Sequence, residues 1–251
     1  LQTNHSENLN IFMKNKKNKL FTFIDLFAGI GGFRVALENN GGICKGYSEI
    51  DNQAIQTYEQ NFLNDSNCKE GALGNIENIQ SLDFDVDLLV GGVPCQSWSV
   101  AGKMKGFDDP RGKLWNDTVR LVNKAKPKAF IFENVKGLAD PRNSRSLEFL
   151  ITSFRDCGYE VYNKVLNSYD YGLPQNRERI YIVGRKKKLI SKDNVFSFPS
   201  QASAGHRLHD LIEGLDEIRN EPKKKLPILS IHKGGKIPHG RNRFQKVDEL
   251  N

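Results

Sequence analysis

The sequence predicts an α/β fold in which helices cover both faces of a doubly wound, mostly parallel sheet with an antiparallel hairpin at one edge. From residue 21 onward, short apolar runs of strand length alternate with amphipathic segments, and this alternation favours a parallel sheet. Right-handed crossovers between parallel strands then place helices on both sides of the sheet. The last two apolar runs have no helix between them, which predicts an antiparallel pair at the edge.

Each expected strand is an apolar run bounded by turn or charged residues. We expect strands at residues 21–27, 43–48, 86–90, 128–132, 159–166 and 179–183, with a short one near Ala72. The expected helices have apolar residues at helical spacing and lie at residues 33–38, 52–62, 112–124 and 145–157. Residues 39–42 end the first helix, and Gly158 ends the last.

The composition indicates a globular chain with one large core. Of 251 residues, 38% are hydrophobic and 27% are charged, and no run approaches the roughly 18 apolar residues of a membrane span. We expect neither a secretory signal nor a membrane segment. The four cysteines are scattered, which argues against a disulfide framework or a zinc ribbon and favours a reducing, cytoplasmic location. His206 and His209 have no cysteine nearby, and we predict no metal site.

The net charge of +7 favours a polyanionic partner. Basic clusters precede the first expected strand at residues 14–19, follow the last at 185–188 and recur at 223–225. Solvated loop charge explains each cluster equally well when the cluster is considered alone.

The most informative residue is Cys95, which lies in a glycine- and proline-containing turn at residues 92–98. This turn follows a predicted strand, and ligands of open α/β sheets bind at the carboxyl ends of the strands. Pro94 fixes its own backbone and keeps the preceding residue extended, so the thiol is held in one direction. A buried, unreactive cysteine is the common alternative, and it suits the other three cysteines.

Two other strand ends carry residues that suit a ligand. Residues 25–32 join the first strand to the first helix, and their glycines let a ligand approach the backbone and the helix N-terminus. Their spacing is not that of the full dinucleotide motif, and a tight turn also explains them. Glu49 ends the second strand, where a carboxylate can accept both hydroxyls of a ribose. Together these features predict a cofactor that contains adenosine.

Charged residues lie at the end of the expected strand at 128–132 and at the start of the one at 179–183. Strand ends 90 and 132 should be neighbours, so that Glu133 and Cys95 face one cleft. A carboxyl group beside apolar residues can have a raised pKa and donate a proton, although an exposed strand terminus is the alternative. Arg177 and Arg179 should point to one face of an extended segment, where they can make forked contacts with a carbonyl, carboxylate or phosphate.

Four segments, in their order and spacing, resemble the motifs of DNA (cytosine-5)-methyltransferases: residues 23–33, 92–96, 133–135 and 175–179. The resemblance covers roughly residues 21–190 and implies a Rossmann-like, S-adenosylmethionine-dependent methyltransferase fold. It implies methyl transfer to carbon-5 of a cytosine flipped out of double-stranded DNA, in a bacterial restriction-modification system.

The resemblance also implies a role for each catalytic candidate. Cys95 would supply the thiolate that adds to carbon-6 of cytosine, so that carbon-5 can attack a methyl sulfonium. Glu133 would bind and protonate ring N3, and Arg179 would hold the carbonyl O2. Arg177 would support the same site or a phosphate. Residues 97–111 resemble the family's mobile loop, which closes over the flipped base.

The implied cofactor is S-adenosylmethionine, with S-adenosylhomocysteine as product. Phe27 and Ile50 would pack on the adenine, Glu49 would take the ribose hydroxyls, and the turn at 29–32 would approach the methionine portion. Asn75 stands where the family usually has an aspartate that reads the adenine amino group, and weakened rather than lost binding is expected. The complete set of expected cofactor contacts is Asp25, Phe27, Gly29, Gly31, Gly32, Glu49, Ile50, Asn75, Ile76 and Pro94.

The same resemblance divides the chain into a basic leader at 1–20, a catalytic and cofactor-binding domain at 21–190, and the incomplete start of a target-recognition region at 191–251. The family's last two motifs are not found after residue 190. A truncated product, one subunit of a split enzyme with a second polypeptide, and a degenerate relative each explain this. The intact catalytic motifs argue against degeneracy.

The sequence leaves two other functions open. One is RNA cytosine-5 methylation on the same fold. The other is a non-catalytic subunit that binds DNA or a partner, against which the retained Cys95, Glu133 and Arg179 argue.

Overall fold

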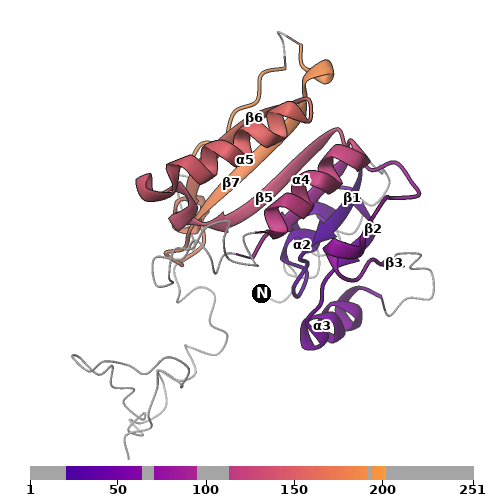
Figure 1. Ribbon diagram of the computed structural model, residues 1–251. Coiled ribbons are helices and arrows are strands. Elements are labelled where there is room, and N and C mark those ends of the chain that lie inside the picture. The colour runs from indigo at the N-terminus through magenta and orange to yellow at the C-terminus, as the bar shows by residue number, and fades with distance from the viewer. Residues whose placement is uncertain (1–20, 64–70, 95–112, 192–193, 202–251) are drawn as a thin grey trace, which may run out of the picture.

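Within the residues that the structure describes, seven strands form one mixed sheet in the order β3-β2-β1-β4-β5-β7-β6 (Figure 1). The computed structural model describes residues 21–63, 71–94, 113–191 and 194–201. The strands are β1 (Phe21–Leu26), β2 (Gly42–Ser48), β3 (Gly71–Ala72), β4 (Leu88–Gly92), β5 (Ala129–Val135), β6 (Tyr159–Asn167) and β7 (Glu178–Lys186). The first five strands are mutually parallel, and β7 is antiparallel to both β5 and β6. This confirms the predicted fold class, including the antiparallel pair at one edge.

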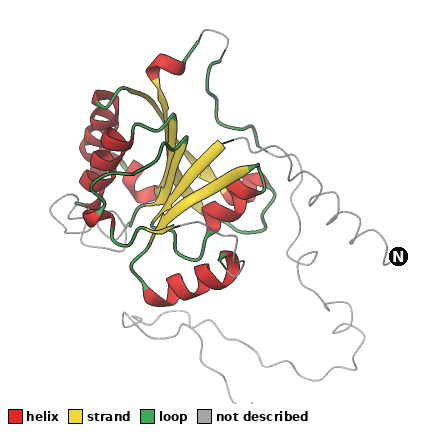
Figure 2. Ribbon diagram, turned by 90° about the vertical axis from the view of Figure 1, so that its right-hand side faces the viewer, coloured by secondary structure: helices red, strands yellow, loops and turns green. Residues whose placement is uncertain are grey.

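Helices lie on both faces of the sheet (Figure 2). They are α2 (Gly32–Glu38), α3 (Asn52–Phe62), α4 (Leu114–Ala125) and α5 (Ser144–Asp156). Short 3-10 helices occur at Ile76–Asn78, Lys136–Ala139, Pro141–Asn143, Ser168–Tyr171 and Lys187–Leu189, and the first of these is η1. The helices predicted from apolar spacing are all present: α3 has the predicted boundaries, and those of the other three are shifted by one or two residues.

Two layers of core separate the helices from the sheet. On one face, Trp115 of α4 and Phe154 of α5 pack with Phe130 and Phe132 of β5, and all four are fully buried. On the other face, α2 packs against Phe23, Cys44 and Val90, while Tyr58 of α3 stacks on Tyr47 of β2. Because β2, β1, β4 and β5 are parallel, their carboxyl ends meet at one edge of the sheet, where α/β proteins bind ligands.

Several strand boundaries differ from the predicted ones, and two of these differences, in β4 and β5, have a clear cause. β4 begins at Leu88 rather than residue 86, because the Asp87 amide donates to Thr22 Oγ1 and its carboxylate accepts from Thr22 N. β5 continues to Val135 rather than ending at residue 132, because Val135 pairs with Arg179 of β7. Both differences arise from partners that are distant in sequence, which a local apolar pattern does not reveal.

The predicted leader at 1–20, the predicted loop at 97–111 and most of the 191–251 region lie outside the described residues. His206 and His209 also lie outside them. Within the described part of the chain, no helix combines the length and apolar character needed to cross a bilayer.

Gly184 of β7 provides a test of this packing. A Cβ atom added at this position would overlap the ring of Phe130, which is fully buried and packed against Phe132, Phe154 and Tyr159. We therefore expect Gly184→Ala to lower the free energy of unfolding by about 1–3 kcal/mol through overpacking. Urea denaturation with an unchanged m-value measures this loss.

Gly71→Ala is the matched control, because a Cβ atom at Gly71 would meet no atom within 4 Å. Its expected change is within about 0.5 kcal/mol. Equal stability losses in the two variants would contradict the packing assigned to Gly184.

Candidate active site

Three of the predicted catalytic residues meet at the carboxyl edge of the sheet. The register pairs Gly92 of β4 with Glu133 of β5, and Glu133 Oε2 would lie 3.4 Å from a Cβ atom on Gly92. Arg179 Nε lies 2.8 Å from Glu133 Oε1, and an Arg177 guanidinium nitrogen lies 4.0 Å from the same oxygen. The side chains of Glu133 and Arg179 are about one-fifth exposed, at 20% and 23%. Glu133 and Arg179 therefore form a partly enclosed ion pair, with the exposed Arg177 at its edge.

The antiparallel strand β7 explains how this cluster forms. Tyr181 pairs with Glu133 and Arg179 pairs with Val135, so side chains two residues apart share one face. Burial, followed by the nearby Glu133 carboxylate, raises the pKa of Tyr181. Arg177 precedes the strand, and its N–H donates to Asn167 Oδ1 at 3.0 Å. The prediction that the two arginines share a face agrees with their common approach to Glu133.

Asn134 holds the turn that leads toward Cys95. Its side chain is 1% exposed, its Nδ2 donates to the Val93 carbonyl at 3.1 Å, and its Oδ1 accepts from Val135 N at 2.8 Å. Pro94 is the last described residue before the segment 95–112, so Cys95 itself lies outside the described residues. The sequence analysis did not single out Asn134, although one pattern pointed to it. Phe130 and Phe132 alternate with less buried residues, and the same alternation places the Asn134 amide at a core position.

We expect Asn134→Ala to lower the free energy of unfolding by about 1–3 kcal/mol, because the buried Val93 carbonyl loses its donor. Urea denaturation measures the loss. Asn123→Ala is the control, since Asn123 is exposed and accepts only from the exposed Lys126 among the bonds described. A change within 0.5 kcal/mol for both variants would show that Asn134 does not support the turn.

The second group of predicted residues surrounds the turn after β1. Glu49 Oε2 accepts from Gly29 N at 2.8 Å, and its Oε1 accepts from Ile50 N and Asp51 N at 2.7 and 2.9 Å. The carboxylate thus fastens the turn after β1 to the turn after β2. Three of its roughly four lone-pair sites are used in this way, and the remaining site lies on Oε2.

Gly29 and Gly31 both have positive φ values, 55° and 95°. A Cβ atom at Gly31 would overlap the Phe62 ring, so glycine is required there for packing as well as for backbone conformation. Gly32 begins α2, and a Cβ atom there would meet no atom within 4 Å. Phe27 has a φ of 52° and is partly buried, whereas Ile50 is 70% exposed.

Asp25 is buried beneath this turn. Its side chain is 1% exposed, and neither carboxylate oxygen has a hydrogen-bond partner within the described part of the chain. Burial raises the pKa of Asp25 to about 8, although the nearby Arg34 guanidinium opposes the shift. Burial therefore favours the neutral form of this carboxyl group, and a cationic group that reached it would favour its ionised form.

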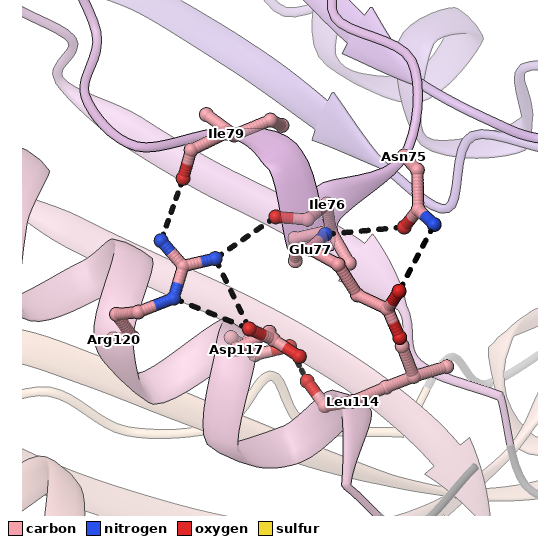
Figure 3. Close-up of polar contacts among 8 residues, drawn as sticks. Asn75, Ile76, Glu77, Ile79, Leu114, Asp117 and Arg120 are labelled. Carbon is pink, nitrogen blue, oxygen red and sulfur yellow. Dashed lines mark hydrogen bonds and ion pairs between the residues drawn. The ribbon is translucent and has the colours of Figure 1, made fainter. Parts of the chain in front are cut away.

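Asn75 begins the turn of η1, and its side chain is directed at Glu77 (Figure 3). Its Oδ1 accepts from Glu77 N at 3.1 Å, and its Nδ2 donates to Glu77 Oε2 at 3.2 Å. The Ile76 side chain is 2% exposed and packs in the core, which leaves its backbone as the part that can face a ligand. The sequence did not reveal that the Asn75 side chain faces Glu77 or that the Ile76 side chain faces the core.

Comparisons with known proteins identify the family of this chain. Residues 21–246 match the family model of the C-5 cytosine-specific DNA methylases. The type II methyltransferase M.HgiCII of Herpetosiphon aurantiacus is 53% identical over 226 residues, which cover 90% of this chain and 50% of that protein. M.HhaI of Haemophilus parahaemolyticus is 40% identical over 211 residues, which cover 84% of this chain and 62% of that protein.

The fold also matches solved structures. A mutant of DNMT2 from Spodoptera frugiperda superposes with a TM-score of 0.59 at 25% identity, covering 77% of this chain and 60% of that one. The chain spans about half the length of the first curated relatives that it matches. The extent of the family match and the identity to these relatives show that the chain belongs to the C-5 cytosine-specific DNA methylase family.

Proposed function

We propose that the protein of which this chain is part transfers a methyl group from S-adenosylmethionine to carbon-5 of a flipped-out cytosine in double-stranded DNA. The proposed setting is the cytoplasm of a bacterium, as the modification enzyme of a restriction-modification system. The observation that carries the proposal is the cluster of Glu133, Arg177 and Arg179 beside the turn that enters Cys95. Relatives named type II methyltransferases support the same reaction class.

The proposed chemistry starts from the low reactivity of cytosine carbon-5. The Cys95 thiolate forms a bond to carbon-6, and Glu133 delivers a proton to ring N3 as the ring becomes an enamine. Arg179, already directed toward this site by Glu133, donates to the carbonyl O2, and Arg177 supports the same site. The nucleophilic carbon-5 then accepts the methyl group. Loss of the carbon-5 proton to a base, with return of the N3 proton to Glu133, lets the bond between carbon-6 and sulfur break, which regenerates the thiolate.

The residues around the turn after β1 fit S-adenosylmethionine. This cofactor supplies an electrophilic methyl group on a sulfonium and leaves as S-adenosylhomocysteine. The buried carboxyl group of Asp25 and the left-handed Gly29 fit a cationic, amino-acid-like portion close to the backbone. Glu49 has a remaining acceptor site for a ribose hydroxyl, while Phe27, Ile50, Asn75 and Ile76 would enclose the adenine. Gly31, Gly32 and Pro94 would complete the expected contacts.

The substrate base must leave the duplex before its carbon-5 can be reached. The net charge of +7 supports a nucleic-acid partner. Target recognition belongs to residues beyond about 190 in this proposal, and a second polypeptide that supplies the family's last motifs is one form the complete enzyme can take.

The test is methyl transfer by the full-length protein from labelled S-adenosylmethionine to duplex DNA and, separately, to transfer RNA. We expect 5-methylcytosine in the DNA, identified by mass spectrometry after nuclease digestion. Label in RNA alone would favour the RNA methyltransferase alternative. Binding of DNA without methylation, even after addition of a polypeptide with the family's last motifs, would favour the non-catalytic subunit.

A further inference from the structure

The segment proposed to face the adenine has little secondary structure of its own. It runs from the two-residue strand β3 into the single turn of η1. Besides the pairing of β3 with β2 in the sheet, two hydrogen bonds hold its first half to β2: Leu73 N donates to the Tyr47 carbonyl at 2.8 Å, and Ser48 Oγ donates to the Gly74 carbonyl at 2.6 Å. A short segment of this kind keeps one conformation only if other elements hold its second half as well.

Arg120 of α4 makes the corresponding contacts to the second half (Figure 3). Its Nη1 lies 2.6 Å from the Ile79 carbonyl oxygen, and its Nη2 lies 3.0 Å from the Ile76 carbonyl oxygen. Asp117, one turn earlier on α4, accepts from Nε and Nη2 at 3.2 and 3.1 Å and so orients the guanidinium. The planar fork of an arginine suits two carbonyls at fixed separation, whereas a lysine is a single point donor.

These bonds act on the same peptide units that would face the cofactor. The Ile76 carbonyl and the Glu77 N–H belong to one planar peptide group. Arg120 holds its oxygen, and Asn75 Oδ1 accepts from its nitrogen. The Ile76 and Ile79 side chains are 2% and 5% exposed, so the core fixes the other side of the turn. Removing the guanidinium would leave the orientation of this peptide group without the bond that fixes it, while the apolar contacts would stay in place.

We propose that Arg120 is a positioning residue that sets the η1 turn for recognition of the adenine ring. This inference rests on the proposed function, because it assumes that the turn at Asn75 and Ile76 faces the adenine. The Arg120 side chain is 27% exposed, and its guanidinium bonds to main-chain carbonyls of this turn and to Asp117. Loss of the guanidinium should therefore change the relative affinity for different purine rings more than it changes the rate of the chemical step.

The test compares binding of S-adenosylhomocysteine and S-inosylhomocysteine, whose purine differs at positions 1 and 6, to the full-length protein by titration calorimetry. We expect R120Q to bind S-adenosylhomocysteine about tenfold more weakly than the unsubstituted protein, as for loss of hydrogen bonds from a charged donor. Binding of the inosine compound should change less than twofold, so that discrimination shrinks. The kcat at saturating S-adenosylmethionine should stay within about twofold.

Arg155→Gln is the matched control, because Arg155 is an exposed arginine on α5. It should leave both affinities unchanged. Unchanged affinities in R120Q, or equal weakening of both compounds, would overturn the inference even if Tm falls. Should R120Q fail to fold, R120K decides: an intermediate loss of discrimination supports the inference, and unaltered discrimination overturns it. An unsubstituted protein that binds neither compound would instead overturn the proposed function together with this inference.

Discussion

Replacing Cys95 with serine should reduce methyl transfer by roughly 10⁴-fold or more, the scale seen when a covalent nucleophile is removed. A thiol reaches its anionic, nucleophilic form near neutral pH far more readily than a hydroxyl does. The proposed reaction cannot begin without an anion that adds to carbon-6. DNA that contains 5-fluorocytosine gives a direct readout, because fluorine at carbon-5 cannot leave as a proton would. The unsubstituted protein should therefore remain covalently attached to that DNA, and Cys95→Ser should not.

Cys157→Ser is the control for this experiment. Cys157 ends α5, and burial raises the pKa of its thiol, which disfavours a thiolate. Its replacement should leave both the methylation rate and the covalent complex intact. A covalent complex that persists in Cys95→Ser, or disappears in Cys157→Ser, would show that the nucleophile has been misassigned.

The fold was largely predictable because it depends on local patterns that repeat. The α3 boundaries were anticipated by helical spacing after Asp51, whose side chain accepts from Gln53 N and Ala54 N as an N-cap. The antiparallel edge followed from the missing helix between the last two strands. By contrast, the extension of β5 to Val135 depends on pairing with Arg179, which lies far along the chain. Patterns within a window cannot reveal a boundary that a distant strand determines.

The candidate site was predictable to the extent that its residues stand at strand ends. Glu133 and Arg179 were assigned to one site, and the structure places their side chains in contact, with Arg177 4.0 Å from Glu133. The supporting contacts were not expected, because Asn134 and Arg120 act through main-chain carbonyls of other segments. Bonds of this kind depend on how two elements pack together. They do not depend on which side chain the acceptor residue carries, because the acceptor is its main-chain carbonyl. Sequence motifs therefore identify reacting groups better than the groups that hold them.

Glu133→Gln should lower kcat by about 10²–10⁴-fold, the usual contribution of a positioned general acid. Glutamine keeps the size of the side chain and can still donate a hydrogen bond to ring N3, but it cannot transfer a proton. It also removes the charge that pairs with Arg179 Nε at 2.8 Å. Single-turnover methylation at saturating S-adenosylmethionine measures the chemical step, and affinity for S-adenosylhomocysteine should change little because the expected cofactor contacts are other residues.

Glu178→Gln separates this effect from a general loss of charge. Glu178 precedes Arg179 on β7 and forms an exposed ion pair with Lys136 at 2.8 Å, a type of contact that contributes at most about 1 kcal/mol. Its replacement should leave kcat within about twofold, because the ion pair between Arg179 and Glu133 is untouched. If both variants slow methylation equally, the negative charge near β7 matters and proton transfer by Glu133 does not. If Glu133→Gln retains full activity, the proton for ring N3 must come from another group.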